Sequence, residues 1–365
     1  MVLYLPVFLP DTMEYNQTAH TENTFDYFVQ WHLTERCNLA CAHCYQEGKR
    51  VSEMALPEIK STIKNISDTM RQWSDIYEIP FSTSFNITGG EPFLRKDLVN
   101  ILKEIYRHHF GISVLTNGTL IEREKARMLA DLPVKGVQVS LEGPEAVHEA
   151  VRGRHSFSSA VRGIECLRDA GIKITINVTL SDMNADYFKD MVALASDLGV
   201  SRLGFSRLVP SGRGLTLLTR MLTKEKLKEV YETIFSLKAP GLEIVTGDPV
   251  ASQLNEEVPE SADGSFPEGG CAAGVSGLTL LPDGTIIPCR RMGVPIGNIL
   301  RDSLRNIWAT SDVLNALRDK KVYKGKCGTC KRWSICRGCR AIAYAYSLSQ
   351  GRNDFLEEDP QCFVE

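Results

Sequence analysis

The sequence lacks any long apolar run. No stretch reaches the roughly 18–20 apolar residues needed to cross a membrane, and the nearest segment, MVLYLPVFLP at the N-terminus, is short and interrupted by proline. A signal-peptide pattern, low-complexity tracts and internal repeats of 20–50 residues are also missing. We therefore expect no membrane partner.

The chain also lacks an excess of charge of either sign. It carries 42 Lys and Arg against 45 Asp and Glu, for a net charge of −3, so it has no basic footprint of the kind that binds nucleic acid. With 365 residues, 43% of them apolar, it is long enough for a large core and two domains. We expect a two-domain globular protein with no nucleic-acid partner.

Cysteine is the residue type that this sequence has in quantity. Eleven cysteines in a small secreted module would predict disulfides, but here they follow metal-type spacings in a long chain without a signal peptide. This pattern predicts metal centres in a reducing, cytoplasmic compartment.

The most informative spacing is C-x3-C-x2-C, formed by Cys37, Cys41 and Cys44 in ERCNLACAHCYQ. Three thiolates leave one iron of a four-iron cluster without a protein ligand, and a cofactor can bind there. His43 lies between the last two cysteines, so a Cys3His zinc site is the alternative.

Strand and helix patterns alternate from residue 28 to residue 237. The expected strands are 28–34, 83–88, 112–116, 135–141, 173–180 and 202–207, and the expected helices are near 57–72, 95–109, 122–131, 157–170, 185–198 and 223–237. Such alternation predicts a parallel sheet with right-handed crossovers. Six β/α units make an α/β fold of the partial (β/α)6, TIM-like barrel type.

Polar residues stand where several of these strands end. Active sites of parallel α/β sheets collect at the carboxyl ends of the strands. Any one of these residues can equally be an ordinary turn or strand-end group, but their joint arrival at strand ends makes them candidate cofactor contacts: Asn117, Ser140, Glu142, Asn177 and Arg207.

The cysteine loop, together with Gly89-Gly90-Glu91-Pro92 at the end of TSFNITGGEP, resembles the CxxxCxxC and GGEP motifs of the radical SAM superfamily. The resemblance implies that the three cysteines ligate a reducing [4Fe–4S] cluster, whose fourth iron is chelated by S-adenosylmethionine (SAM). It also implies that Gly89, Gly90, Glu91 and Pro92 line the methionine amino group.

The stretch VSLEGPEAVHEAVRGRHSF is similar to the family pattern that holds the nucleoside. By this resemblance Ser140 and Glu142 bind the ribose, although the family usually has Asp where this chain has Glu142. Arg152 falls near the expected position of the methionine carboxylate, with a surface salt bridge as the alternative. Tyr45 and His43 are the candidates for the adenine side.

The cysteines return after residue 270. They are Cys271, Cys289, Cys327, Cys330, Cys336, Cys339 and Cys362. A zinc ribbon is the alternative for CGTCKRWSICRGC, and the Pro-Asp-Gly turn between LTLL and TIIP predicts a β-hairpin.

The order C-x12-G-x4-C, C-x2-C-x5-C-x2-C and a last cysteine resembles the SPASM extension of radical SAM enzymes, a small cysteine-rich α+β domain with two auxiliary [4Fe–4S] clusters. The family usually has x3 as the final spacing of the quartet. By resemblance the distal cluster has the ligands Cys327, Cys330, Cys336 and Cys362, and the nearer cluster has Cys271, Cys289 and Cys339. The expected cofactors are therefore three [4Fe–4S] clusters and SAM, with one auxiliary ligand that is not a cysteine.

The expected domains are an N-terminal extension at 1–27, the barrel at 28–238, a linker rich in Pro, Gly, Glu and Ser at 239–270, and the SPASM domain at 271–365. The resemblance covers residues 28–365.

The first functional hypothesis is oxidative modification of a ribosomal peptide or protein, such as a thioether or carbon–carbon crosslink. Because 27 residues are too few for a leader-recognition domain, this hypothesis implies a separate recognition protein or a substrate that needs no leader. An electron donor such as flavodoxin or ferredoxin is also expected. Modification of a tetrapyrrole (heme-type) side chain is the alternative within the same chemistry, and a non-enzymatic zinc or iron scaffold is the alternative outside it. No catalytic acid or base is assigned.

Overall fold

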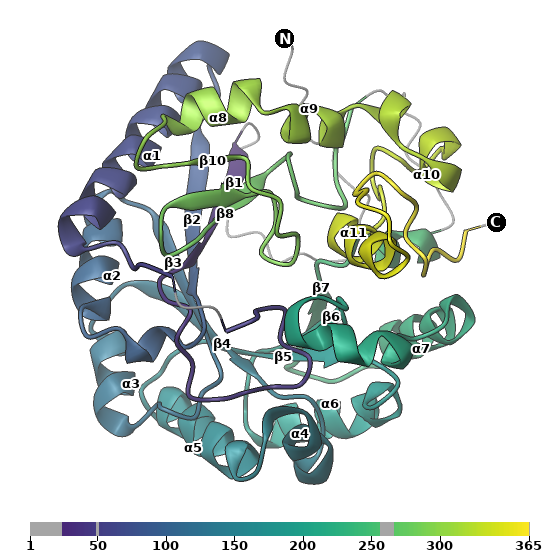
Figure 1. The fold of residues 1–365 in the computed structure, drawn as a ribbon. Helices are drawn as coiled ribbons and strands as arrows, with labels where there is room; N and C mark the ends of the chain where they lie inside the picture. Colours follow the sequence, from purple (N-terminus) through teal and green to yellow (C-terminus); the bar gives the residue numbers. More distant parts are fainter. Residues whose placement is uncertain (1–23, 49–50, 256–265, 365) are drawn as a thin grey trace.

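A ten-stranded sheet forms the centre of the molecule in the computed structural model, which describes residues 24–48, 51–255 and 266–364. The strand order is β10-β9-β8-β1-β2-β3-β4-β5-β6-β7. Figure 1 shows the sheet curving behind an outer layer of helices. The arrangement is a partial barrel, as the alternation of strands and helices predicts.

Each of the six predicted strands is present, and each is followed by a predicted helix. The strands are β1 (Phe25–His32), β2 (Phe81–Thr88), β3 (Gly111–Thr116), β4 (Val134–Ser140), β5 (Ile174–Leu180) and β6 (Arg202–Arg207). The helices are α1 (Leu56–Tyr77), α2 (Leu98–Arg107), α3 (Arg123–Ala130), α5 (Ser156–Asp169), α6 (Phe188–Asp197) and α7 (Lys224–Ser236). Neighbouring strands pair in parallel. A further short helix, α4 (Glu145–Arg152), follows β4 and was not predicted.

Sequence periodicity explains why these elements form. Along α1 the buried residues Ile59, Ile63, Ile66, Met70 and Trp73 recur every three or four positions, which places one apolar stripe against the sheet. In β5, buried and partly buried residues alternate along the whole strand. Both patterns direct apolar side chains into the layer between sheet and helices.

The sheet continues beyond the six units at both edges. Strand β7 (Glu243–Thr246) pairs in parallel with β6, and a 3-10 helix at Pro249–Leu254 follows it. The predicted linker at 239–270 is therefore corrected: its first part belongs to the sheet, because Ile244 and Val245 pair with β6. Residues 256–265 of that linker, and residues 1–23 of the predicted N-terminal extension, lie outside the described residues.

At the other edge, the C-terminal part of the chain adds three strands. Strand β8 (Gly277–Leu280) pairs in parallel with β1, and β9 (Thr285–Ile287) turns back antiparallel to β8, which confirms the predicted hairpin. Strand β10 (Gly297–Asn298) pairs with β9. The two halves of the chain therefore share one sheet.

Four helices complete the C-terminal part: α8 (Leu304–Thr310), α9 (Asp312–Arg318), α10 (Gly325–Thr329) and α11 (Arg340–Ser349). Helix α8 lies along α1 (Figure 1). Trp308 of α8 packs there on Tyr27 and Trp73, with ring centroids 5.3 and 5.8 Å away. None of the helices in the described ranges is long and apolar enough to span a membrane.

Candidate functional site

A pocket open to solvent lies at the carboxyl ends of the strands, where a parallel α/β sheet collects its ligands. It contains about 920 Å³ of empty space, a volume that includes open solvent. Its walls come from the loop after β1, from the ends of β2 to β6 and from the segment after β9. Of the predicted contact residues, those that line it are His43, Tyr45, Gly89, Gly90, Asn117, Ser140, Arg152, Asn177 and Arg207.

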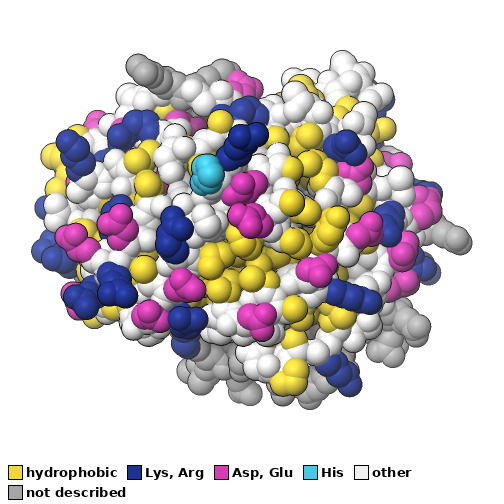
Figure 2. Space-filling view, turned by 90° about the horizontal axis from the view of Figure 1, so that it is seen from below, with side chains coloured by type: hydrophobic (Ala, Val, Ile, Leu, Met, Phe, Trp, Pro, Cys, Tyr) yellow, Lys and Arg dark blue, Asp and Glu magenta, His cyan; other side chains and the backbone are white. Residues whose placement is uncertain are grey.

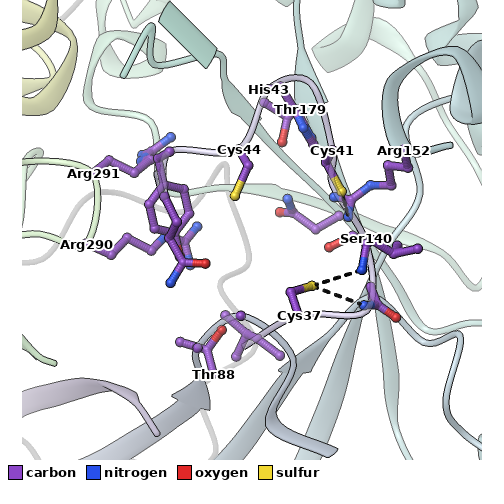
Figure 3. A pocket seen from close by; sticks show the side chains of 18 of the residues that line it. Cys37, Cys41, His43, Cys44, Thr88, Ser140, Arg152, Thr179, Arg290 and Arg291 are labelled. Atoms are coloured by element: carbon purple, nitrogen blue, oxygen red, sulfur yellow. Dashed lines mark hydrogen bonds between the residues drawn. The ribbon is translucent and has the colours of Figure 1, made fainter. Parts of the chain in front are cut away.

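The three cysteines of the first motif also line this pocket. Cys37, Cys41 and Cys44 reach it from one loop, and Figure 3 shows their sulfurs facing its interior. Burial raises the pKa of the Cys37 and Cys41 thiols, so a bound metal would have to displace their protons. Three thiols without a fourth side-chain ligand fit a cluster that shares one iron with a cofactor.

A single metal ion is the alternative for the cysteine groups. In residues 24–48, 51–255 and 266–364, no three Cys, His, Asp or Glu side chains converge closely enough to hold one.

The two glycines at the end of β2 bring the cysteine loop close to the sheet. Gly90 donates its backbone N–H to the Thr34 carbonyl at 2.6 Å, and Glu91 donates to the Arg36 carbonyl at 2.8 Å. A Cβ on Gly90 would lie 2.2 Å from the Arg36 oxygen, and one on Gly89 would lie 2.4 Å from the Thr34 oxygen. Only glycine permits this approach.

The Glu91 side chain accepts hydrogen bonds from groups that lie behind the pocket wall. Its carboxylate accepts hydrogen bonds from the Thr116 hydroxyl and the Asn117 N–H, each at 2.9 Å, and from the Phe93 N–H at 3.2 Å. Neither Glu91 nor Pro92 is among the residues lining the pocket. Glu91 anchors the end of β3 in this structure, and the contact of Glu91 and Pro92 with the methionine amino group stays a prediction.

Glu142 is likewise buried behind the wall. Its Oε1 accepts from Arg152 Nη2 at 2.6 Å and lies 3.0 Å from His43 Nε2, while its Oε2 accepts from the Thr179 N–H at 2.8 Å. Burial alone would raise the pKa of this carboxyl, but Arg152 and His43 hold the pKa well below its usual range. Glu142 fixes Arg152 and His43, which do line the pocket, and its contact with the ribose stays a prediction.

Arg152 extends from this ion pair toward the cysteine loop. Its Nη1 lies 3.6 Å from the Cys41 sulfur. The guanidinium therefore holds a position between the buried carboxylate and a candidate cluster ligand, so the alternative of a surface salt bridge is wrong for this residue.

Arg207 lines the pocket but uses its guanidinium elsewhere. All five N–H donors of this side chain are taken: two by Asp248, two by Asp359 and one by Gln361, at 2.7–3.0 Å. No donor is left for a cofactor, so that predicted role is corrected. Arg207 joins the end of β6 to the C-terminal segment.

The side of the pocket opposite Ser140 and Arg152 was missed by sequence reasoning. Arg290 and Arg291 reach it from the C-terminal half (Figure 3). The guanidinium carbon of Arg290 lies 5.9 Å from the centre of the Tyr45 ring. The paired arginines directly after Cys289 were the available signal.

A segment after β6 holds the cysteine loop in place through hydrogen bonds. Arg213 donates from Nε to the Cys41 carbonyl at 3.2 Å, and Gly214 donates its N–H to the Cys44 carbonyl at 3.0 Å. The loop is thus held by backbone contacts at both ends.

Several of the C-terminal cysteines lie close to one another. In the distal group, Gln253 Nε2 lies 3.5 Å from the Cys336 sulfur and 3.4 Å from the Cys362 sulfur. Cys327 is near enough to both for their thiolate charges to interact, and Cys330 follows it at the end of α10. Burial raises the pKa of Cys336 to about 11.

In the nearer group, Cys271 and Cys289 pack on the apolar cluster that contains Cys339. Burial raises the pKa of the Cys339 thiol to about 12. Cys166 of α5 packs instead on the barrel core, as expected for a structural thiol. The division of the seven C-terminal cysteines between two clusters, which the resemblance implies, stays a prediction.

Two family models match the chain. The Radical SAM superfamily matches residues 31–195, and an iron-sulfur cluster-binding domain, SPASM, matches residues 271–340. Mycofactocin maturase MftC of Mycolicibacterium smegmatis is 33% identical over 345 residues, which cover 92% of this chain and 82% of that protein. AdoMet-dependent heme synthase of Methanosarcina barkeri is 30% identical and covers 92% and 95%.

Solved structures share the fold. A structure of anSMEcpe with bound AdoMet and a peptide has a TM-score of 0.70 at 19% identity, covering 93% of this chain and 94% of that one. Streptococcus suis SuiB bound to S-adenosylmethionine has a TM-score of 0.69 at 18% identity and covers 93% and 78%. Fold, site and relatives together define a radical SAM enzyme. More particularly, the chain belongs to the radical SAM superfamily with a C-terminal SPASM domain, and this membership implies iron–sulfur clusters and SAM.

Proposed function

We propose that this enzyme cleaves SAM reductively and oxidatively modifies a ribosomal peptide or protein. The observation that carries the proposal is that Cys37, Cys41 and Cys44 line the same pocket as the strand-end residues and the arginines of the C-terminal half. When bound, the cluster and SAM would supply a 5′-deoxyadenosyl radical able to take hydrogen from an unactivated C–H bond.

Different residues would bind the cluster and the different groups of SAM. Cys37, Cys41 and Cys44 would hold the SAM-binding cluster, and Arg152, fixed by Glu142, would hold the SAM carboxylate. Gly89 and Gly90 let the loop approach closely enough to bind the amino group through backbone atoms. The task of the protein in such chemistry is to orient the cofactor and exclude water.

The C-terminal cysteines would hold two auxiliary clusters, which provide a path for the electron released when substrate is oxidised. Cys327, Cys330, Cys336 and Cys362 would hold the distal cluster, and Cys271, Cys289 and Cys339 the nearer one. An electron donor such as flavodoxin or ferredoxin would reduce the first cluster.

A peptide substrate is supported by relatives of two kinds. One is named as a mycofactocin maturase, and solved structures of similar fold hold a precursor peptide in SuiB and a peptide in anSMEcpe. The thioether or carbon–carbon product and a separate leader-recognition protein belong to this proposal. A tetrapyrrole is the second candidate substrate, because the heme synthase relative is 30% identical over 92% of this chain.

The test is anaerobic incubation of reconstituted enzyme with SAM, reductant and either a candidate precursor peptide or an iron porphyrin. Mass spectrometry should detect 5′-deoxyadenosine and a peptide that has lost hydrogen. A modified porphyrin with an unchanged peptide would replace the first proposal by the second, and no 5′-deoxyadenosine under any condition would reject both.

A further inference from the structure

The pocket wall is cationic and contains no acidic side chain. Its arginines are Arg152, Arg207, Arg213, Arg290 and Arg291, and no Asp or Glu is among the lining residues. The carboxylate of Glu142 satisfies Arg152, and those of Asp248 and Asp359 satisfy Arg207. Three arginines are left to give the pocket its charge.

Of these three arginines, Arg290 and Arg291 are adjacent in the C-terminal half, and their charges are the least compensated by carboxylates. Within the described part of the chain, no carboxylate forms an ion pair with Arg290 or Arg291, and the Arg290 guanidinium carbon lies 5.9 Å from the centre of the Tyr45 ring. Arg291 donates from Nη1 to the Arg207 carbonyl at 3.1 Å, while its buried Nε has no hydrogen-bond partner. Two neighbouring guanidinium groups are therefore held at the pocket, and at least one N–H donor, that of Arg291 Nε, has no partner among the described residues.

Such an arrangement costs free energy unless an anion completes it. The planar guanidinium of arginine binds a carboxylate through two parallel hydrogen bonds. The SAM carboxylate has its own arginine, Arg152, on the opposite side of the pocket (Figure 3). The pair at Arg290 and Arg291 therefore faces the space left for the substrate.

Charge compensation of the nearer auxiliary cluster is the competing explanation. It fits Arg291, whose charge interacts with the thiolates of Cys339 and Cys289. It fits Arg290 less well, because Arg290 lines the pocket with its guanidinium carbon 5.9 Å from the centre of the Tyr45 ring. Arg290 is the member of the pair that is available to a ligand.

We propose that Arg290, assisted by Arg291, binds a carboxylate of the substrate and so orients the substrate between the two halves of the chain. The inference rests on the proposed function and narrows it: the peptide presents either its C-terminal carboxylate or an Asp or Glu side chain. In the tetrapyrrole alternative a propionate would take the same place.

The test is equilibrium dialysis of the SAM-loaded holoenzyme against mixed N-acetylated tetrapeptides. Three pools without other acidic groups are compared: C-terminal acids, C-terminal amides with one Glu, and C-terminal amides with one Gln. A parallel arm compares coproporphyrin III with its tetramethyl ester. Wild-type enzyme should retain one acidic pool, or the free porphyrin, about tenfold better than the neutral counterpart, which corresponds to about 1.4 kcal/mol.

Arg290→Gln should remove this preference, Arg290→Lys should restore part of it, and the exposed Arg301→Gln should keep it as the matched control. Absence of preference in wild-type enzyme that forms 5′-deoxyadenosine would overturn the inference and leave the proposed function standing. Preference retained in Arg290→Gln, with only the cluster spectrum changed, would assign the arginine to charge compensation. A loss of SAM affinity in Arg290→Gln as large as its loss of preference would assign the arginine to the cofactor. Each of these last two results overturns the inference.

Discussion

Arg207 and Asp359 lie 152 residues apart in sequence and form two hydrogen bonds of 2.7 and 3.0 Å, with both side chains at most 1% exposed. Asp248, which follows β7, binds the other edge of the same guanidinium. Three segments therefore meet at one buried ion cluster beside the pocket.

Arg207→Met should lower the free energy of unfolding by about 3–5 kcal/mol, because it leaves two buried carboxylates without their cation. Anaerobic guanidinium titration followed by circular dichroism measures this loss. The matched control is Arg202→Met on the same strand, which breaks a partly exposed pair with Glu243 and should cost at most about 1 kcal/mol. Equal losses in the two variants would contradict the structural role given to Arg207.

Replacing Cys37, Cys41 or Cys44 by Ala should abolish formation of 5′-deoxyadenosine, because each replacement removes a ligand of the SAM-binding cluster. The circular dichroism spectrum should stay that of the wild type. The side chain of Cys166 packs on the barrel core, and the control variant Cys166→Ala should still form 5′-deoxyadenosine. Turnover persisting in any variant of the triad would reject the radical mechanism.

Gly90→Ala should decrease 5′-deoxyadenosine formation by about 100-fold, since a Cβ 2.2 Å from the Arg36 oxygen forces the cysteine loop to move and displacements near 1 Å have effects of this size. Chromatography of the quenched reaction measures it. Gly293→Ala is the control, because no atom lies within 4 Å of the added carbon. Near-normal rates in Gly90→Ala would contradict the requirement for glycine at this position.

Reconstituted protein should contain about 12 iron atoms per chain, the sum of three four-iron clusters, with zinc below one equivalent. The triple replacement of Cys37, Cys41 and Cys44 by Ala should reduce the content to about eight. Metal analysis by mass spectrometry gives both values. Active wild-type enzyme with about four irons and stoichiometric zinc would refute the auxiliary clusters.

Gln253→Leu should lower the reduction potential of the distal auxiliary cluster, because hydrogen bonds to ligand sulfurs help to set such potentials and this variant removes a donor shared by Cys336 and Cys362. A redox titration followed by electron paramagnetic resonance measures the shift. Ser252→Ala, one residue away and bonded to the Pro249 carbonyl, should leave the potential unchanged. An unaltered potential in Gln253→Leu would place the cluster elsewhere.

Local patterns were sufficient to predict the six β/α units, because the alternation of β5 and the apolar stripe of α1 are contained in their own residues. Long-range pairing is not. Strand β8 was expected as half of a hairpin, yet nothing in GLTL indicates that it pairs with β1, some 250 positions earlier. Likewise β7, four residues long, was absorbed into a predicted linker.

The same limit applies to the site. Motif spacing predicted the cysteine loop and the glycines, since those residues act from one short segment each. Glu142 and Arg207 were given cofactor roles because they stand at strand ends, but their side chains bind partners from other segments, and such partners appear only in three dimensions. Arg290 shares a pocket with Cys44, 246 positions earlier in the sequence, and this pairing was missed for the same reason.

The pairing of β8 with β1 has a consequence for shortened forms of the enzyme. If the chain ended before residue 271, the β1 edge would present a row of unpaired backbone groups from Phe28 to Trp31. Exposed edges of this kind are templates for association between copies. The cysteine-rich half therefore also protects the barrel from aggregation, and a truncated barrel should precipitate even when its SAM-binding residues are intact.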